Sequence, residues 1–305
     1  RSCQALLRCG LMTSQALTPG ALPRLRSVLF APAVRDDLIP KLTRSGADGV
    51  VIDCEDATPV SQKAAGRSNA VELAPTIMGQ GSAVFIRVNP PGTPWFADDI
   101  SFGLHRDLAG VVVPMVETLE GLDQCARALA EADLGHLGIV AGLETARGVA
   151  DARYLLAHSQ VIGGYFGAED YIADLGGVRT QNNVEVQFAR ASIAQAGRLS
   201  DKPVIDQIVA NFRDNDRMSL EAFEARAMGF EGKLCIHPDQ VALANAGFTP
   251  SDAEIERAER LLAAYDIGVA SGVAAIDFEG SMVDEPLAEQ ARQILAAAGI
   301  NPRNG

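Results

Sequence analysis

The sequence predicts a closed (β/α)₈ barrel, because short apolar runs alternate with helical segments along a chain of 305 residues. Eight of these runs are rich in β-branched residues. Strands that alternate with helices indicate βαβ units and a parallel sheet, and eight units in a chain of this length favour a closed barrel. Hydrophobic residues make up 48% of the chain, which is enough to form one large core.

The predicted strands are nearly continuous apolar runs, which is typical of strands covered on both faces. They span Ser27–Ala33, Gly49–Cys54, Ala83–Val88, Gly110–Met115, Leu137–Leu143, Val161–Phe166, Pro203–Val209 and Lys233–Ile236. The helices predicted between them carry apolar residues at three-to-four spacing. They span Asp36–Arg44, Ser61–Ala74, Leu119–Glu131, Ala146–Ala157, Asn183–Arg198 and Leu220–Ala227.

Two further helices are predicted after the eighth strand, Pro250–Asp266 with Ser251 as a possible N-cap, and Pro286–Ala298. We therefore expect a barrel over residues 21–249. Residues 250–305 are expected to form a helical extension that packs on the barrel or on a neighbouring subunit. Residues 1–20 are expected to be disordered, or to be an artificial addition or a mis-assigned start.

The formal net charge of −13 argues against a general nucleic-acid binder, because phosphates would be repelled. No apolar run is long enough to cross a bilayer, so we expect no membrane association. The five cysteines lack C-x-x-C spacing, which fits a reducing compartment, and a cytoplasmic location is expected.

Polar residues close the predicted strands, and in a barrel these strand ends meet at one mouth. The acidic ones include Asp53, Glu55, Asp56, Glu117, Glu144, Glu169, Asp170, Asp206 and Asp239. Converging carboxylates repel one another unless cations neutralise them. Oxygen ligands without a Cys/His cluster favour Mg²⁺, with Mn²⁺ possible, and we predict Glu144 and Asp170 as the ligands. The alternative is that each caps a helix or pairs with an arginine such as Arg147.

Arg87 closes the third predicted strand and faces the acidic rim. Its planar guanidinium could hold a substrate carboxylate in a bidentate pair, or it could neutralise Asp53 or Glu55, and the residues alone leave both open. Imine chemistry is disfavoured, because Lys202 and Lys233 lie at the starts of their strands, away from the predicted mouth. His237 is interpreted as a residue that orders a loop, since Pro238 follows it.

Six segments in fixed order resemble the citrate lyase β-subunit-like family, which includes malyl-CoA and citramalyl-CoA lyases. They are Ser27–Pro32, Asp53–Ala57 with Lys63 and Arg67, Ile86–Asn89, Glu144–Gly148, Phe166–Tyr171 and Gly232–Pro238. The resemblance covers roughly residues 24–290. It implies a TIM barrel, often trimeric or hexameric, that uses Mg²⁺ to cleave or form a carbon–carbon bond in short acyl-CoA thioesters.

Carried over by motif, the resemblance assigns Glu144 and Asp170 as metal ligands and Arg87 as the residue that holds the keto acid. Met282-Val283-Asp284-Glu285-Pro286 matches a motif whose Asp enters a neighbouring subunit's site as acid/base. An ordinary helix N-cap is the alternative for Asp284. Many relatives carry Lys after the Pro that ends the fourth strand, whereas this chain has Met115, which bears on substrate preference.

The resulting hypothesis is a Mg²⁺-dependent lyase that splits a citramalyl-, malyl- or citryl-CoA type thioester into acetyl-CoA and a keto acid, or catalyses the reverse condensation. Metal chelation by the substrate would make the bond cleavage feasible. The alternatives are a metal-dependent 2-keto-3-deoxy sugar-acid aldolase and a catalytically silent binding subunit. The expected partners are the acyl-CoA and keto-acid substrates and further copies of the chain.

Overall fold

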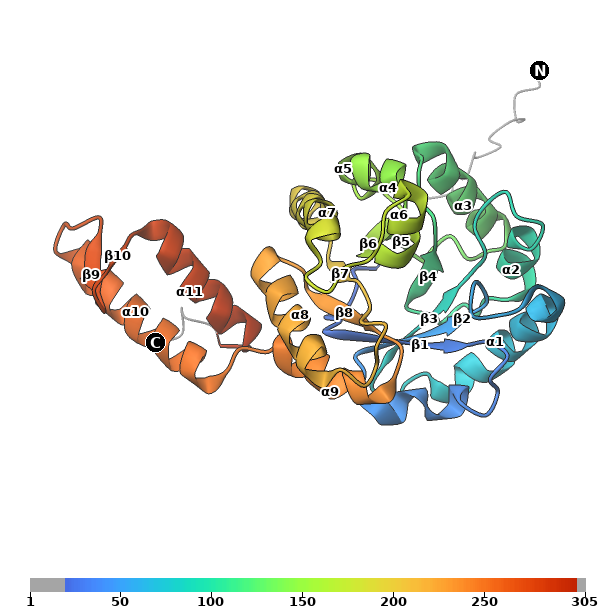
Figure 1. Ribbon diagram of the computed structural model, residues 1–305, viewed down its shortest axis with the longest axis horizontal. Coiled ribbons are helices and arrows are strands. Elements are labelled where there is room, and N and C mark those ends of the chain that lie inside the picture. Colours follow the sequence, from blue (N-terminus) through green and yellow to red (C-terminus); the bar gives the residue numbers. More distant parts are fainter. Residues whose placement is uncertain (1–19, 301–305) are drawn as a thin grey trace, which may run out of the picture.

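The computed structural model describes residues 20–300, which form a closed eight-stranded barrel followed by a helical extension (Figure 1). Neighbouring strands pair in parallel, and β8 pairs with β1 to close the barrel. The predicted fold class is therefore confirmed. The prediction for residues 1–20 falls, apart from Gly20, outside the described residues.

All eight predicted apolar runs overlap a barrel strand, although the seventh run shortens to three residues and the eighth strand begins one residue early, at Gly232. The strands are β1 Ser27–Pro32, β2 Gly49–Asp53, β3 Ala83–Arg87, β4 Gly110–Val113, β5 Ile139–Leu143, β6 Val161–Phe166, β7 Val204–Asp206 and β8 Gly232–Cys235.

Helices surround the barrel, and most of them match the predicted segments. They are η1 Ile39–Ser45, η2 Val60–Gln62, α1 Lys63–Ile77, α2 Phe96–Phe102, α3 Leu119–Glu131, α4 Ala146–Ala150, α5 Ala152–Leu155, α6 Ala168–Leu175, η3 Val184–Val186, α7 Gln187–Ser200, α8 Asn215–Met228 and α9 Pro238–Gly247. The first predicted helix is a 3₁₀ segment. The segment predicted as Ala146–Ala157 is divided at Asp151 into α4 and α5, and α2, α6 and α9 were not predicted.

Side chains alternate between the barrel interior and the helical layer, as the twofold period of a strand requires. The interior is filled by Val28, Val51, Phe85, Val112, Val140, Ile162, Tyr165, Ile205 and Leu234, with Leu25 beneath them. The alternate positions, such as Leu29 and Ile52, pack outward against the helices in a larger core. This alternation decides which strand-end residues can reach the mouth.

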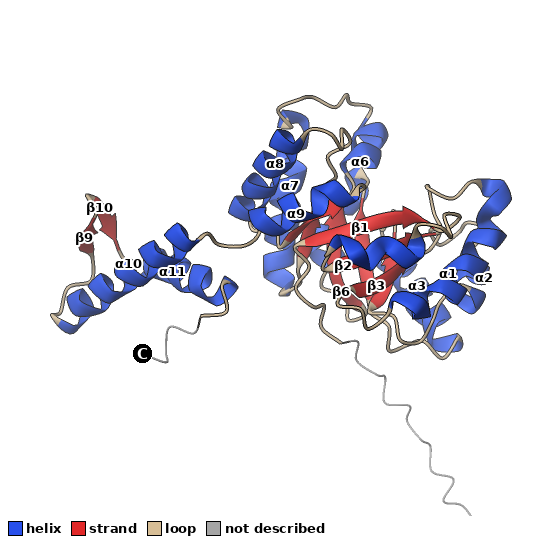
Figure 2. Cartoon of the chain, turned by 90° about the horizontal axis from the view of Figure 1, so that it is seen from below, coloured by secondary structure: helices blue, strands red, loops and turns tan. Residues whose placement is uncertain are grey.

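The extension consists of α10 Asp252–Ala270, a hairpin of β9 Ile276–Phe278 and β10 Ser281–Val283, and α11 Glu285–Ala297. Ser251 caps α10 through a capping box, as the sequence suggested. The unit has its own small core and stands to one side of the barrel (Figures 1 and 2). It touches the barrel through Arg24, which donates to the Ala297 carbonyl, and through the Arg226–Glu254 ion pair. Packing on a neighbouring subunit stays a prediction.

Among residues 20–300, no helix combines the length and the apolar character that a membrane span requires. Cys54, Cys125 and Cys235 are buried free thiols, in line with their positions inside apolar runs.

Candidate active site at the barrel mouth

A cavity of about 470 Å³ opens where the strands end at their carboxyl termini. This is the end of the barrel at which enzymes of this fold place their sites. The lining residues come from seven of the eight strands and the loops that follow them. They are Phe30, Ala31, Pro32, Asp53, Asp56, Ala57, Arg87, Glu144, Tyr165, Phe166, Gly167, Ala168, Glu169, Asp170, Ile208, Leu234 and Ile236. The structure thus brings three of the four predicted site residues, Arg87, Glu144 and Asp170, into one cavity.

Glu144 follows β5 and is only 2% exposed. Its Oε2 accepts a hydrogen bond of 2.8 Å from the backbone N–H of Met115. Burial raises the pKa of Glu144 to about 7, because the Arg87 charge and this hydrogen bond offset only part of the lost hydration. The predicted alternatives, a helix cap or a pair with Arg147, do not describe this carboxylate: Thr145 caps α4, and Arg147 lies near Asp151.

Met115 reaches Glu144 from an unusual backbone conformation, with φ of 52°. A bulky side chain rarely adopts this left-handed region, which costs about 1–3 kcal/mol and is found mainly where a site requires it. Met115 follows the strand-ending Pro114, the position at which the family resemblance would place a lysine. At this position the backbone N–H, and not a side-chain cation, faces the carboxylate.

Two glycines leave room for the Glu144 carboxylate. A Cβ on Gly167 would lie 2.4 Å from Glu144 Oε1 and 2.5 Å from its Cγ. A Cβ on Gly142 would lie 2.6 Å from the Tyr165 hydroxyl and 3.0 Å from Glu144 Oε2. Both positions therefore require glycine if Glu144 is to keep its place against the wall of the cavity.

Asp170 lies in the first turn of α6 and faces the same cavity as Glu144. Its pKa is raised by burial first and by the nearby Asp56 charge second, and the Arg87 charge opposes both. The cavity therefore carries several carboxylates that this single guanidinium does not fully neutralise.

Arg87 ends β3 and forms a two-bond fork with Asp53, at 2.8 Å from Nε to Oδ1 and 2.6 Å from Nη2 to Oδ2. Its Nη1 lies 3.1 Å from Glu55 Oε2, and its guanidinium lies over the Phe30 ring. The structure thus contains the neutralising pair that the sequence left open. A guanidinium has five N–H groups, so three remain beyond the two that bond Asp53.

The loop that carries Asp53, Glu55 and Asp56 is anchored by Lys63. The Lys63 ammonium donates to the carbonyls of Cys54 and Glu55, at 3.0 and 2.8 Å, and to Asn89 Oδ1 at 2.7 Å. Lys63 is buried, and its bonds explain why this lysine matched the motif without reaching the mouth. It fixes the backbone beside Asp53.

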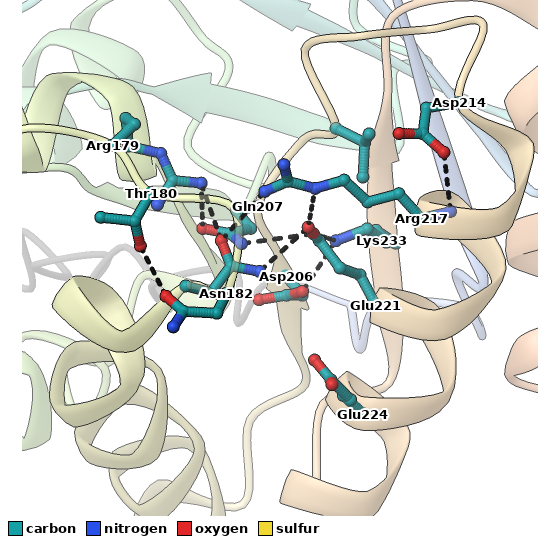
Figure 3. Close-up of polar contacts among 12 residues, drawn as sticks. Arg179, Thr180, Asn182, Asp206, Gln207, Asp214, Arg217, Glu221, Glu224 and Lys233 are labelled. Carbon is teal, nitrogen blue, oxygen red and sulfur yellow. Dashed lines mark hydrogen bonds and ion pairs between the residues drawn. The ribbon is translucent and has the colours of Figure 1, made fainter.

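Asp206 does not reach the mouth, which contradicts the sequence-based expectation. It points outward from β7, where Arg190 forms a two-bond fork with it, and Lys233 donates to it at 2.9 Å. Lys233 also donates to Glu221 at 3.0 Å within the buried polar network shown in Figure 3. The reason is strand alternation, because Ile205 and Leu234 occupy the inward positions. Lys233 thus lies away from the cavity, so its ammonium cannot form an imine with a substrate bound at the mouth.

Asp284 is not at the mouth of its own chain. It occupies the N-cap position of α11 in the extension, but its side chain makes no capping hydrogen bond. The helix-cap alternative is therefore not realised by its carboxylate. Met282, two residues earlier in the hairpin, is 65% exposed.

The donor set at the mouth suits a hard cation. Among the described residues, no three His, Cys, Asp or Glu side chains converge to hold an ion alone. Mg²⁺ commonly takes one or two carboxylates and completes its shell with water and substrate oxygens. Glu144, in its glycine-lined space, and Asp170 fit that pattern.

Fold and mouth together define a (β/α)₈ barrel with an acidic site of the kind used for divalent cations. The chain belongs to the HpcH/HpaI aldolase/citrate lyase family, whose model matches residues 26–238. It is 46% identical over 276 residues to a citrate lyase subunit beta-like protein of Deinococcus radiodurans, covering 89% of this chain and 96% of that protein. The resemblance read from the motifs is confirmed.

Other relatives are named as lyases or thioesterases. Human mitochondrial citramalyl-CoA lyase is 28% identical over 293 residues, covering 91% of this chain and 86% of that protein. Among solved structures, CitE of Mycobacterium tuberculosis in complex with magnesium, acetoacetate and coenzyme A matches with a TM-score of 0.75 at 30% identity. The match covers 90% of this chain and 97% of that one.

Sequence reasoning missed Tyr165, Gly142 and Gly167 at the site. Tyr165 was hidden inside an apolar strand, where an aromatic residue is typical of core. The glycines carried a usable signal, because each lies two residues from another inward position of its strand, Gly142 from Val140 and Gly167 from Tyr165. A glycine at the inward end of a barrel strand indicates that another group needs the space.

Proposed function

We propose that this chain is a Mg²⁺-dependent carbon–carbon lyase acting on a short 3-hydroxyacyl-CoA of the citramalyl-, malyl- or citryl-CoA type. It would release acetyl-CoA and a keto acid, or run the condensation. The observation that carries the proposal is Glu144, a buried carboxylate with one backbone donor, held beside Asp170 in an acidic cavity. The magnesium and coenzyme A complex of the related CitE protein supports it.

Glu144 and Asp170 would hold the cation, which when bound polarises the oxygens of the keto-acid half. Arg87 would bind the substrate carboxylate through N–H groups that Asp53 leaves free. The Asp53 fork holds the guanidinium plane fixed, so that little entropy is lost when the substrate arrives. In the cleavage direction a base takes the proton of the 3-hydroxyl group, the carbonyl of the keto acid forms, and the electron pair of the broken carbon–carbon bond becomes the acetyl-CoA enolate. An acid then protonates the methyl carbon of that enolate.

Asp284 of a neighbouring copy would supply that proton. Two observations support this role: the carboxylate makes no capping bond in α11, and the extension stands away from its own barrel (Figure 2). Exposed apolar side chains on the extension, Ile267 and Met282, provide a surface for contact with another subunit. A homotrimer or hexamer is the assembly we propose.

The test is a substrate screen with malyl-, citramalyl- and citryl-CoA, with Mg²⁺ present and then chelated. We expect one thioester to be cleaved, with activity lost on chelation and in Glu144→Ala and Asp170→Ala. Glu131→Ala, a change of the same type at an exposed position of α3, is the matched control. Cleavage of a keto-deoxy sugar acid without any CoA substrate would favour the aldolase, and inactivity on all substrates would favour the binding subunit.

A further inference from the structure

Tyr165 is a buried polar residue that lines the cavity but is neither a proposed metal ligand nor a proposed substrate-binding residue. It lies on β6 with its side chain directed into the barrel, 2% exposed, and its ring packs edge-on against Phe30. Its hydroxyl is buried and, among the described residues, is the side-chain polar atom that lacks a hydrogen-bond partner. A buried hydroxyl without a partner is costly, and phenylalanine would fill the same space without that cost.

The surroundings of the hydroxyl show what it could bond. The point where a Gly142 Cβ would lie is 2.6 Å from the Tyr165 hydroxyl and 3.0 Å from Glu144 Oε2, so the two groups border the same small space. Burial raises the pKa of Tyr165, the neighbouring Glu144 charge raises it further, and the Arg87 charge opposes both. The hydroxyl thus has an acceptor and a donor as neighbours.

We propose that Tyr165 is a positioning residue, whose hydroxyl donates to the Glu144 carboxylate and fixes it in the orientation that binds the divalent cation. The inference rests on the proposed function, because it requires Glu144 to be a metal ligand. Groups that hydrogen-bond to ligating carboxylates orient them, and removing such a group typically weakens metal affinity or activity by about 10–100-fold. Gly142 contributes to this arrangement, because a Cβ there would come within 2.6 Å of the Tyr165 hydroxyl and 3.0 Å of Glu144 Oε2.

The test measures metal binding directly, with Mn²⁺ as a paramagnetic probe of the full-length protein. Tyr165→Phe keeps the ring and removes only the hydroxyl, so we expect Mn²⁺ to bind about 10–100-fold more weakly with no fall in the metal-free thermal midpoint. The variant's turnover should fall at limiting Mg²⁺, and excess Mg²⁺ should recover part of it. Tyr154→Phe, at an exposed position of α5, is the matched control and should bind Mn²⁺ as the wild type does.

A second variant, Gly142→Ala, tests the same pairing of the Tyr165 hydroxyl with the Glu144 carboxylate, because its added Cβ would crowd both groups. It should weaken Mn²⁺ binding as well. If Tyr165→Phe binds Mn²⁺ within twofold of the wild type, the positioning role is overturned. It is also overturned if the weaker binding comes with a matching loss of thermal stability, because the hydroxyl would then serve the fold. Failure of the wild type itself to bind Mn²⁺ would instead refute the proposed metal site, so the two failures are distinguishable.

Discussion

Replacing Gly167 with alanine should lower turnover by about 100-fold while leaving the barrel folded. The added Cβ would lie 2.4 Å from Glu144 Oε1, whereas ordinary contacts of this kind begin near 3.4 Å. The carboxylate must therefore move by roughly 1 Å, since Gly167 lies on the backbone that leads from β6 into α6. A misplacement of about 1 Å at a catalytic group costs on the order of 100-fold in rate.

The assay combines turnover of the best CoA thioester, Mn²⁺ binding and thermal unfolding. Gly135→Ala is the matched control, because a Cβ there would come no closer than 3.5 Å to its nearest neighbour, Ala130. We expect the control to behave as the wild type in all three measurements. A Gly167→Ala protein that is folded and retains wild-type turnover and Mn²⁺ affinity would refute the assignment of Glu144 as a ligand held by this glycine.

Three further changes test other parts of the site and its support. Arg87→Lys should lower kcat/KM by at least about 10-fold, because a point charge cannot replace the planar fork, and near-normal kcat/KM would make Arg87 structural. For Glu221, burial raises the pKa but its basic neighbours outweigh this and lower it to about 2. Its ionised form should add about 3 kcal/mol to the free energy of unfolding above pH 4.5, and this contribution should disappear as the pH falls toward 2. In denaturant melts, Glu221→Gln should lack this pH dependence. If the variant keeps the pH profile of the wild type, the stabilising role of the Glu221 carboxylate is contradicted. Mixing inactive Asp284→Asn with inactive Glu144→Ala subunits should restore activity by pairing intact halves, and no recovery after verified subunit exchange would contradict the between-subunit site.

The sequence predicted the barrel because its strands are buried on both faces and therefore appear as unbroken apolar runs. The same feature hid the direction of each side chain, since a run with no polar alternation does not show which residues face inward. Asp206 was for this reason placed at the mouth, although it belongs to the outward set with Lys233. Glu144 and Arg87 lie in the inward register, so the structure places both at the cavity.

Long-range pairings were the other limit of the sequence. The fork between Arg87 and Asp53 joins residues 34 positions apart, and local propensity gives no preference for it over a substrate carboxylate. The short helix α2 was missed because its seven residues, Phe96–Phe102, contain two aspartates and lack a clear apolar period. The hairpin of β9 and β10 was missed because its three-residue strands depend on α10 and α11 for burial.

The path of the chain after β8 bears on whether Asp284, the proposed acid/base residue, can act at the mouth of its own barrel. β8 ends at the mouth, and α9 returns beside β1 to the opposite end of the barrel, where Arg24, three residues before β1, donates to the Phe248 carbonyl. The extension therefore departs from the end of the barrel that lies away from Glu144 and Asp170. Asp284 follows a further helix and hairpin within that extension, which supports the proposal that its carboxylate acts at the mouth of another copy.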